Sequence, residues 1–417
     1  MIRTTTSILV SLIITLGCAA SASQAPPTSS PQQPHADTTR LFRAIWVTRM
    51  DYRTDADVRR IIEDCATLGL TDVIWQVRGQ ADAFYASDLE PWGRELVRDL
   101  PAKSATAGPG FDPLATAVEA AHERKLKLHA WVNVMPLWKG LTPPTDLKHP
   151  FNTHPEWRLA DQNGVAQPLN DHYVIVNPVR EDVQDHIVKV CRDLVTRYAI
   201  DGLHMDYVRF VSEKMDAKSI YPGDPASLKL FTAATGHAAV ATKEEHAAFQ
   251  GWKRSRITDL VRRIHDEAIV TRPGVEFSAA VWRRPEIARE TYLQDAAKWL
   301  NDGTLDRALP MIYTDKDEQF GGDLAAWIAA SPDRALCPGL GTYLHLVDQT
   351  PRQLEAARET GRTRGFAIFA YSSLFDTADP SQNKDSKSKF ERSQRSTAIA
   401  NYIRGLVPPA SGSSDDR

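Results

Sequence analysis

Short apolar runs alternate with longer segments of helical periodicity from residue 41 onward. A short run of apolar, β-branched and aromatic residues between polar turns is typical of a buried strand. Apolar residues three or four positions apart over a longer segment are typical of a helix that covers a sheet. The expected strands are 43–49, 72–78, 127–134, 200–207, 276–282, 308–314, 336–343 and 365–371. The expected helices are 55–68, 112–125, 179–198, 252–270, 291–301, 323–330, 350–360 and 388–404.

Eight strands, each followed by a helix, predict an α/β fold, a (β/α)8 barrel of the TIM type. The alternative is a doubly wound open sheet, which normally has a glycine-rich turn after its first strand. The segment that follows here, VTRMDYRTDAD, contains no glycine, and this favours the barrel. The loops after strands 2, 3 and 4 cover residues 79–111, 135–178 and 208–251. They are too long to be simple connections, so we expect them to form the walls of a cleft.

The two ends of the chain differ in composition from this alternating region. A signal peptide is expected over 1–22, because Arg3 is followed by an apolar run too short to span a bilayer and then by small residues. Residues 23–40 are rich in Pro, Ser and Gln and are expected to be a disordered linker. The barrel is expected over 41–405, and a disordered tail over 406–417.

Two processing interpretations of this signal remain open, and both export the protein. Cys18 follows the apolar run as the lipidated cysteine does in bacterial lipoproteins, whereas 20–22, Ala-Ser-Ala, resembles an ordinary cleavage site. The expected location is therefore the periplasm, or the outer membrane as a lipoprotein with a lipid anchor at Cys18.

Composition and charge exclude several classes of protein. The 42% hydrophobic and 25% charged residues are ordinary for a soluble globular protein. The formal net charge of −3, without a dense Lys/Arg stripe, gives no reason to expect a nucleic-acid partner. Cys65, Cys191 and Cys337 are widely spaced and predict small buried side chains rather than disulfides or a metal site. We expect a monomer without a cofactor.

The segment 201–210, DGLHMDYVRF, places polar residues in a buried strand. Side chains two apart share one face of a strand, so His204 and Asp206 lie on the same side, opposite Met205. Functional groups of a barrel lie at the C-terminal ends of its strands, where Asp206 is expected to point inward. An inward carboxylate is costly unless it is paired or used, which favours a functional role.

Aromatic and polar side chains share this inward phase on other strands. Rings that stack on pyranose faces, next to groups that bind hydroxyls, are typical of a sugar-binding cleft. Some of these side chains can instead be plain barrel packing, and the mid-strand His129 and His204 are also interpreted as hydrogen-bonded core histidines. The expected contributors are Gln76, Arg78, His129, Trp131, Asn133, Trp282, Met311, Tyr313 and Asp315.

A metal site is the competing chemistry at this barrel mouth. His204 and Asp206 share one face, and His129 is a third candidate ligand. Barrel metallohydrolases usually carry a His-x-His on strand one, and strand 43–49 contains no His. We therefore expect no metal.

Several blocks of the sequence resemble a known family. The segments RAIWVTRMDY, IWQVRGQADAFYASDLEPW, FDPLATAVEAAHERKLKLHAWVNVMP, HPEWRL, YAIDGLHMDYVRF and KWLNDGTLDRALPMIY occur in the order found in the glycosyl hydrolase-like family 10 domain, a bacterial barrel family. The resemblance covers roughly residues 41 to 404. It implies an exported glycoside hydrolase whose polysaccharide substrate belongs to the bacterial cell envelope, peptidoglycan strands in particular.

The strand-four motif departs from the family pattern Asp-Gly-Ile-His-Phe-Asp-Asp-Tyr. Asp201, Gly202, His204, Asp206 and Tyr207 fit it, but one of the two consecutive Asp residues is missing. The same strand partly resembles the chitinase pattern Asp-Gly-x-Asp-x-Asp-x-Glu, without the Glu that serves there as general acid. A chitinase mechanism therefore does not transfer intact.

Glycoside cleavage normally needs two carboxyl groups, one that protonates the leaving oxygen and one that acts as base or nucleophile. Asp206 is the first candidate, and Asp315 is the best-placed second by strand phase. The residues expected to position sugar are Arg78, Trp131, Asn133, His204, Tyr207, Trp282 and Tyr313, and the reserve carboxylates are Glu286, Glu213 and Glu90. Because one motif Asp is missing, the alternative hypothesis is a non-catalytic glycan-binding barrel.

Overall fold

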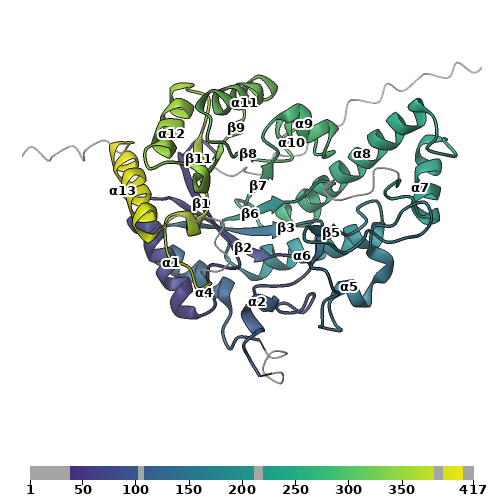
Figure 1. Cartoon of the computed structure of the whole chain (residues 1–417), viewed down its shortest axis with the longest axis horizontal. Helices are drawn as coiled ribbons and strands as arrows, with labels where there is room; N and C mark the ends of the chain where they lie inside the picture. The colour runs from purple at the N-terminus through teal and green to yellow at the C-terminus, as the bar shows by residue number, and fades with distance from the viewer. Residues whose placement is uncertain (1–37, 102–107, 211–218, 380–387, 407–417) are drawn as a thin grey trace, which may run out of the picture. The chain divides into compact units, whose positions relative to one another are not determined.

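The computed structural model describes residues 38–101, 108–210, 219–379 and 388–406. Within these ranges, parallel strands close into an eight-position barrel that helices surround (Figure 1). Around the barrel the order is β10, β11, β1, β2, β3, β6, β7 and β8, and β8 pairs with β10 to close it. The strands are β1 (Phe42–Val47), β2 (Asp72–Arg78), β3 (Lys127–Asn133), β6 (Gly202–Asp206), β7 (Glu276–Val281), β8 (Arg307–Ile312), β9 (Ala335–Leu336), β10 (Gly339–Gly341) and β11 (Gly365–Phe369).

The expected (β/α)8 barrel is therefore confirmed, with one difference in the seventh strand. The predicted strand 336–343 is divided into β9 and β10, both of which pair with β8. Pro338 lies between the two pieces, and a proline has no N–H to contribute to a continuous ladder. The seventh position of the barrel is filled all the same, because β10 also pairs with β11.

Helices follow the strands, and some of them begin at a side-chain cap. Thr54 and Thr242 each form a capping box, and Asp112 accepts hydrogen bonds from the first turn of its helix. The capping box at Thr242 starts one helix well before the expected residue 252. The outer helices are α1 (Asp55–Thr67), α4 (Pro113–Glu123), α6 (Glu181–Arg197), α8 (Lys243–Glu267), α9 (Pro285–Glu290), α10 (Ala296–Asn301), α11 (Asp317–Ala330), α12 (Gln349–Glu359) and α13 (Lys389–Leu406).

The three loops predicted to be long carry small elements of their own. The elements in these loops are α2 (Arg94–Val97), the antiparallel pair β4 (Pro136–Lys139) and β5 (Tyr173–Ile175), α5 (Pro150–Thr153), the 3-10 turn η1 (Pro155–Trp157) and α7 (Pro225–Thr235). The remaining 3-10 turns are η2 (Ile269–Thr271), η3 (Thr342–Leu344) and η4 (Tyr371–Ser373).

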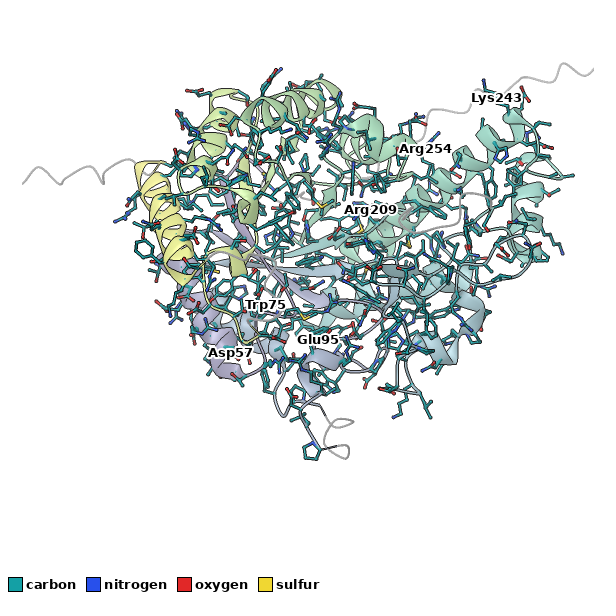
Figure 2. All side chains as sticks on the ribbon, in the orientation of Figure 1. Asp57, Trp75, Glu95, Arg209, Lys243 and Arg254 are labelled. Carbon is teal, nitrogen blue, oxygen red and sulfur yellow. The ribbon has the colours of Figure 1, made fainter. Side chains whose placement is uncertain are left out.

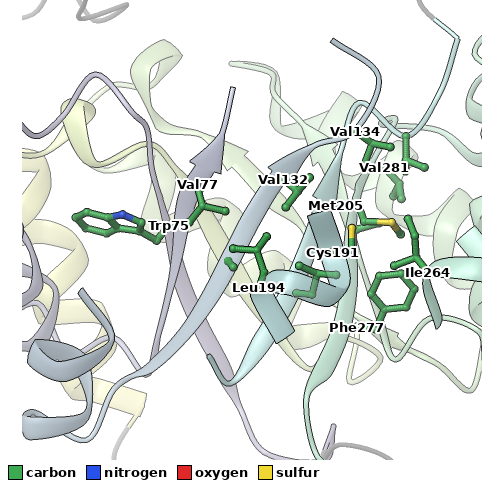
Figure 3. Packing of buried hydrophobic residues seen from close by; sticks show 14 of the residues in the cluster. Trp75, Val77, Val132, Val134, Cys191, Leu194, Met205, Ile264, Phe277 and Val281 are labelled. Carbon is green, nitrogen blue, oxygen red and sulfur yellow. The ribbon is translucent and has the colours of Figure 1, made fainter. Parts of the chain in front are cut away.

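Each barrel strand has an outer and an inner face, as the alternation of side chains requires. Val132 and Met205 lie on the outer face, in the same buried apolar cluster as Cys191 and Leu194 of α6 (Figure 3). The inner faces form a second, separate cluster that fills the barrel. The inner cluster contains Phe42, Ala44, Trp46, Ile74, Trp131, Ala280, Leu309, Cys337, Ala367 and Ala370.

The N-terminal end of the barrel is filled by paired charges rather than by apolar side chains. Arg40 donates two hydrogen bonds to Asp72, at 2.6 and 2.5 Å, and His129 Nε2 lies 2.9 Å from the same carboxylate. Arg307 Nε donates to Glu276 at 2.5 Å. Because every one of these buried charges has a partner of opposite charge or a hydrogen bond, the layer is structural. This fits the interpretation of His129 as a core histidine.

The terminal segments bear on export and tethering, and most of them lie outside the described residues. This applies to the expected signal peptide, to Cys18, to the linker up to residue 37 and to the tail from residue 407. None of the helices in the described part of the chain combines the length and apolar composition needed to cross a membrane.

Candidate functional site

A cavity of about 310 Å³ opens at the C-terminal ends of the barrel strands. This is the end at which the fold of a (β/α)8 barrel places functional groups. Aromatic, amide, cationic and carboxylate side chains line the cavity together. The lining residues are Trp46, Thr48, Arg49, Met50, Asp51, Gln76, Trp131, Asn133, Lys139, Tyr173, Asp206, Tyr207, Arg209, Ala280, Met311, Tyr313, Tyr343, Phe369, Ala370, Ser372 and Ser373.

Asp206 is the last residue of β6 and lines this cavity with only 6% of its surface exposed. Its Oδ1 accepts hydrogen bonds from the backbone N–H of Tyr207, at 2.6 Å, and from Nη1 of Arg209, at 3.0 Å. Its Oδ2 accepts no hydrogen bond from any described residue. One oxygen is therefore held in place, while the other is left for a molecule in the cavity.

The chain turns sharply directly after this carboxylate. Tyr207 has a φ of +52°, in the left-handed region that non-glycine residues rarely adopt, and such strain is concentrated at functional sites. The turn brings Arg209 back to the strand end, with its guanidinium carbon 4.1 Å from the centroid of the Tyr207 ring. Arg209 is labelled among the side chains in Figure 2. The motif position after Asp206 therefore contributes a ring and a bent backbone to the cavity.

Three further rings form a packed group on the side of β8, β10 and β11. Tyr313 stacks on Phe369 with centroids 5.2 Å apart, and Tyr343 lies against Phe369 at 6.2 Å. Burial raises the pKa of Tyr313 well above its ordinary value, and the nearby charge of Asp206 adds to this effect. The phenol therefore stays protonated and is a hydrogen-bond donor at neutral pH.

Strand β3 contributes Trp131 and Asn133, both of which line the cavity as the strand phase predicts. The indole N–H of Trp131 donates to Oδ1 of Asn133 at 2.9 Å, and Nδ2 of Asn133 donates to the carbonyl of Gly79 at 3.0 Å. These bonds fix the plane of the indole ring. A fixed ring loses little conformational entropy when a sugar stacks on it.

His204 lies one layer below the cavity and does not line it. Its Nε2 accepts from the indole N–H of Trp46 at 3.2 Å, which leaves Nδ1 to donate to Ser278 Oγ at 2.9 Å. Burial lowers the pKa of His204 far below its ordinary value, so the ring is neutral. The sequence predicts that His204 contacts sugar, whereas the structure places it below the cavity. Strand phase specifies which side of the strand a residue faces but not its depth in the barrel.

Arg78 does not line the cavity either. A β-bulge between Gln76 and Arg78 shifts the register of β2 against β3, so Arg78 leaves the inward phase that Gln76 keeps. The buried guanidinium instead binds Glu90, with Nη2 2.7 Å from Oε1, and donates to the carbonyls of Asn133 and Val134. Its role is to anchor the loop after β2 to the loop after β3.

Trp282 and Asp315 also lie outside the cavity, although both were expected at it. The Trp282 ring packs against Tyr292 with centroids 4.0 Å apart, and the guanidinium carbon of Arg209 lies 5.7 Å from the Trp282 ring centroid. Asp315 is exposed, because β8 ends at Ile312 and the chain turns before residue 315. The alternation of side chains applies within a strand and not beyond its end.

The reserve carboxylates lie elsewhere. Glu90 is buried between Arg78 and His186 Nε2, which is 2.9 Å from its Oε1. Glu286 is exposed and paired with Arg284. Glu213 lies outside the described residues.

Asp51 is a second carboxylate of the cavity, and the sequence prediction did not include it. It follows β1 by four positions, in the short segment before α1, and is 1% exposed. Among the described residues, Asp51 and Asp206 are the two carboxylates that line the cavity. The sequence feature that could have identified Asp51 is its position in the first strand-to-helix loop, because a barrel places functional groups in such loops.

Two cations of the cavity lining are neighbours of the same tyrosine. Lys139 and Tyr173 are paired in the β4–β5 ladder, and Nη2 of Arg49 donates to the Tyr173 hydroxyl at 3.2 Å. Nε of Arg49 lies 3.8 Å from Glu95, whereas the exposed Lys139 side chain has no ion-pair partner among the described residues. We call Arg49, Tyr173 and Lys139 the basic wall. It favours an anionic group on a bound molecule.

Metal ligation was the competing chemistry for this end of the barrel. Across the described ranges, no group of three or more His, Cys, Asp or Glu side chains is arranged to hold a metal ion. The two candidate imidazoles form other hydrogen bonds, His129 with Asp72 and His204 with Trp46 and Ser278.

Comparisons with known proteins agree with this geometry. Residues 41–332 match the family described as Glycosyl hydrolase-like 10. Glycosyl hydrolase YngK of Bacillus subtilis is 27% identical over 314 residues, which are 68% of this chain but 56% of that protein. Glycosyl hydrolase DigH of Escherichia coli K12 is 25% identical over 323 residues, which are 69% of each protein.

The fold is also found among solved structures. The catalytic domain of a β-amylase from Paenibacillus polymyxa superposes with a TM-score of 0.56 and 11% sequence identity. The superposition covers 88% of this chain and 99% of that domain. At this identity the similarity establishes the barrel and leaves the chemistry to the residues of the cavity.

Proposed function

Because the chain belongs to the glycosyl hydrolase-like 10 family, we propose that it is an exported glycoside hydrolase that cleaves glycan strands of the bacterial cell envelope. The family and the barrel shared with a glycosidase support a function of the glycoside hydrolase type. The chain spans only 56% of the length of the first of its curated relatives, so the activity is argued from the cavity itself.

The observation that carries the proposal is the arrangement of Asp206 in a ring-lined cavity. Its Oδ1 accepts hydrogen bonds from Tyr207 and Arg209, its Oδ2 accepts none from a described residue, and the side chain lines the cavity. Glycosidic bonds are cleaved by carboxyl groups beside the anomeric carbon, and an ion-paired carboxylate suits the role of base or nucleophile. Trp131 and Tyr313 offer the flat faces on which pyranose rings stack.

The basic wall supports a substrate that carries carboxylates. Peptidoglycan strands from which the peptides have been removed expose the lactyl carboxylate of each muramic acid. Lys139 and Arg49 would attract such a group, whereas a neutral glycan would leave the Lys139 charge without a partner. Export, which this substrate requires, rests on the signal-like residues 1–22, with anchoring through Cys18 as the lipoprotein form.

The direct test is to incubate the full chain with purified peptide-free glycan strands and to measure new reducing ends. We expect soluble fragments and one new reducing end for each bond cleaved. Binding to the strands without new reducing ends would instead support a glycan-binding barrel, which the missing second Asp of the strand-four motif favours. If the strands are neither bound nor cleaved, the proposal is overturned.

We expect Lys139→Gln to raise KM for these strands about fivefold with little change in kcat. An exposed charge pair contributes up to about 1 kcal/mol, and this corresponds to about fivefold in affinity. The measurement is KM at low and high salt, because wild-type KM should rise with ionic strength more steeply than the variant's. Equal KM values at low salt would remove Lys139 from substrate recognition.

A further inference from the structure

Two carboxylates of the described chain line the cavity, and they come from different strand ends. Asp206 ends β6, whereas Asp51 lies in the loop that follows β1. Strands β2 and β3 separate β1 from β6 around the barrel. The two side chains therefore approach the same space from different directions, as a pair that acts on opposite sides of one glycosidic bond must do.

The two carboxylates have opposite electrostatic surroundings. Asp206 forms an ion pair with Arg209 at 3.0 Å. Asp51 forms no ion pair with a described residue, and its Oδ2 is bound by the backbone N–H of Thr48, at 2.6 Å, and by the Thr48 hydroxyl, at 3.0 Å. Its Oδ1 has no donor among the described residues and is not one of the fully buried polar atoms without a partner, and the residue lines the cavity.

We infer that Asp51 is the proton donor of the reaction and that Asp206 is its partner carboxylate. This inference rests on the proposed glycoside hydrolase function and assigns the second carboxyl group that such cleavage needs. The geometry that supports it is the shared cavity, the unbonded oxygen on each carboxyl group and the ion pair that belongs to Asp206 alone.

The proton and electron balance of the step is simple. The carboxyl proton of Asp51 moves to the glycosidic oxygen while the electron pair of the C1–O bond passes to that oxygen, and the leaving sugar departs as an alcohol. Water supplies the hydroxyl group that C1 finally carries, and the proton lost by that water restores the acid form of the carboxyl pair. Asp206 either removes this proton or forms the transient bond to C1. No redox partner is needed.

The surroundings of Asp51 support a protonated carboxyl group. Burial raises the pKa of Asp51 to about 7, although the hydrogen bonds from Thr48 and the charge of Arg60 on α1 oppose the shift. Two further titratable groups lie near Asp51, the thiol of Cys65 on α1 and the phenol of Tyr52. Burial raises the pKa of both, and the negative charge of Asp51 raises each pKa further. A general acid works best with a pKa near the working pH.

The test uses the full chain and the same peptide-free glycan strands, with kcat/KM measured as a function of pH. Because the donor must be protonated, wild-type kcat/KM should fall as the pH rises above about 7. Asp51→Asn should lose about 10²- to 10⁴-fold in rate, as removal of a general acid does, and should lack this alkaline limb. The matched control is Asp333→Asn, because Asp333 is exposed and does not line the cavity. This variant should behave as wild type.

Each outcome has a definite meaning. An active Asp51→Asn variant that keeps the alkaline limb overturns this inference and leaves the proposed function in place. An inactive wild-type chain overturns the proposed function and this inference with it. If Asp51→Asn fails to fold, as its bonds to Thr48 allow, the wild-type profile alone decides, because a profile that stays flat through pH 7 excludes Asp51 as the donor.

Discussion

Asp206→Asn is expected to reduce glycan cleavage by about 10³-fold or more. The amide keeps an oxygen that accepts from the Tyr207 N–H and from Arg209, so the cavity retains its geometry. What is lost is the negative charge, and an amide can neither attack C1 nor remove a proton from water. New reducing ends per enzyme per second give the activity, and thermal unfolding shows that the variant is folded.

The control for this prediction is again Asp333→Asn, which makes the same chemical change at an exposed site. A folded Asp206→Asn variant with unchanged turnover would remove Asp206 from the mechanism. A variant that still binds the strands but cleaves none of them would locate its role in the chemical step rather than in binding.

Gly202→Ala is expected to cost about 3 kcal/mol of unfolding free energy, which is the upper part of the range for overpacking in a core. A Cβ on Gly202 would lie 2.0 Å from Nδ1 of His129, which is fully buried and bonded to Asp72 on its other nitrogen. The imidazole cannot move without losing that bond. Urea unfolding followed by circular dichroism measures the loss.

Gly321→Ala is the matched control for this substitution. Gly321 lies inside α11, is exposed and has nothing within 4 Å of an added Cβ. The same chemical change should there stabilise the chain by about 0.5–1 kcal/mol, because alanine has the higher helix propensity. Equal effects of the two substitutions would contradict the close approach of Gly202 and His129.

Much of the site was predictable from strand phase. Asp206, Trp131, Asn133 and Tyr313 line the cavity as strand phase predicts, because each lies in a strand or one position beyond its end. Tyr207 lines the cavity for a different reason: it follows the inward Asp206, and its φ of +52° turns the chain out of the strand alternation. The family resemblance is also confirmed, over residues 41–332.

The predicted residues that lie outside the cavity have equally specific causes. Arg78 is out of phase because of a β-bulge, Asp315 lies beyond a turn, and His204 is on the inward side but below the cavity. Asp51 was missed because it lies four residues beyond β1, where no periodic rule applies. Its direction is set by the hydrogen bonds to Thr48, which no pattern of apolar positions encodes.

The amino-acid sequence by itself determined the barrel, the order of its strands and the inward carboxylate of the fourth strand. These features depend on local periodicity, and each residue satisfies that periodicity independently of distant parts of the chain. Only the tertiary structure decided that the loop after β1 and the end of β6 share one cavity, and that Lys139 and Arg49 lie on one wall of it. Loops have no repeating geometry, so their side chains are positioned by contacts between segments far apart in the chain.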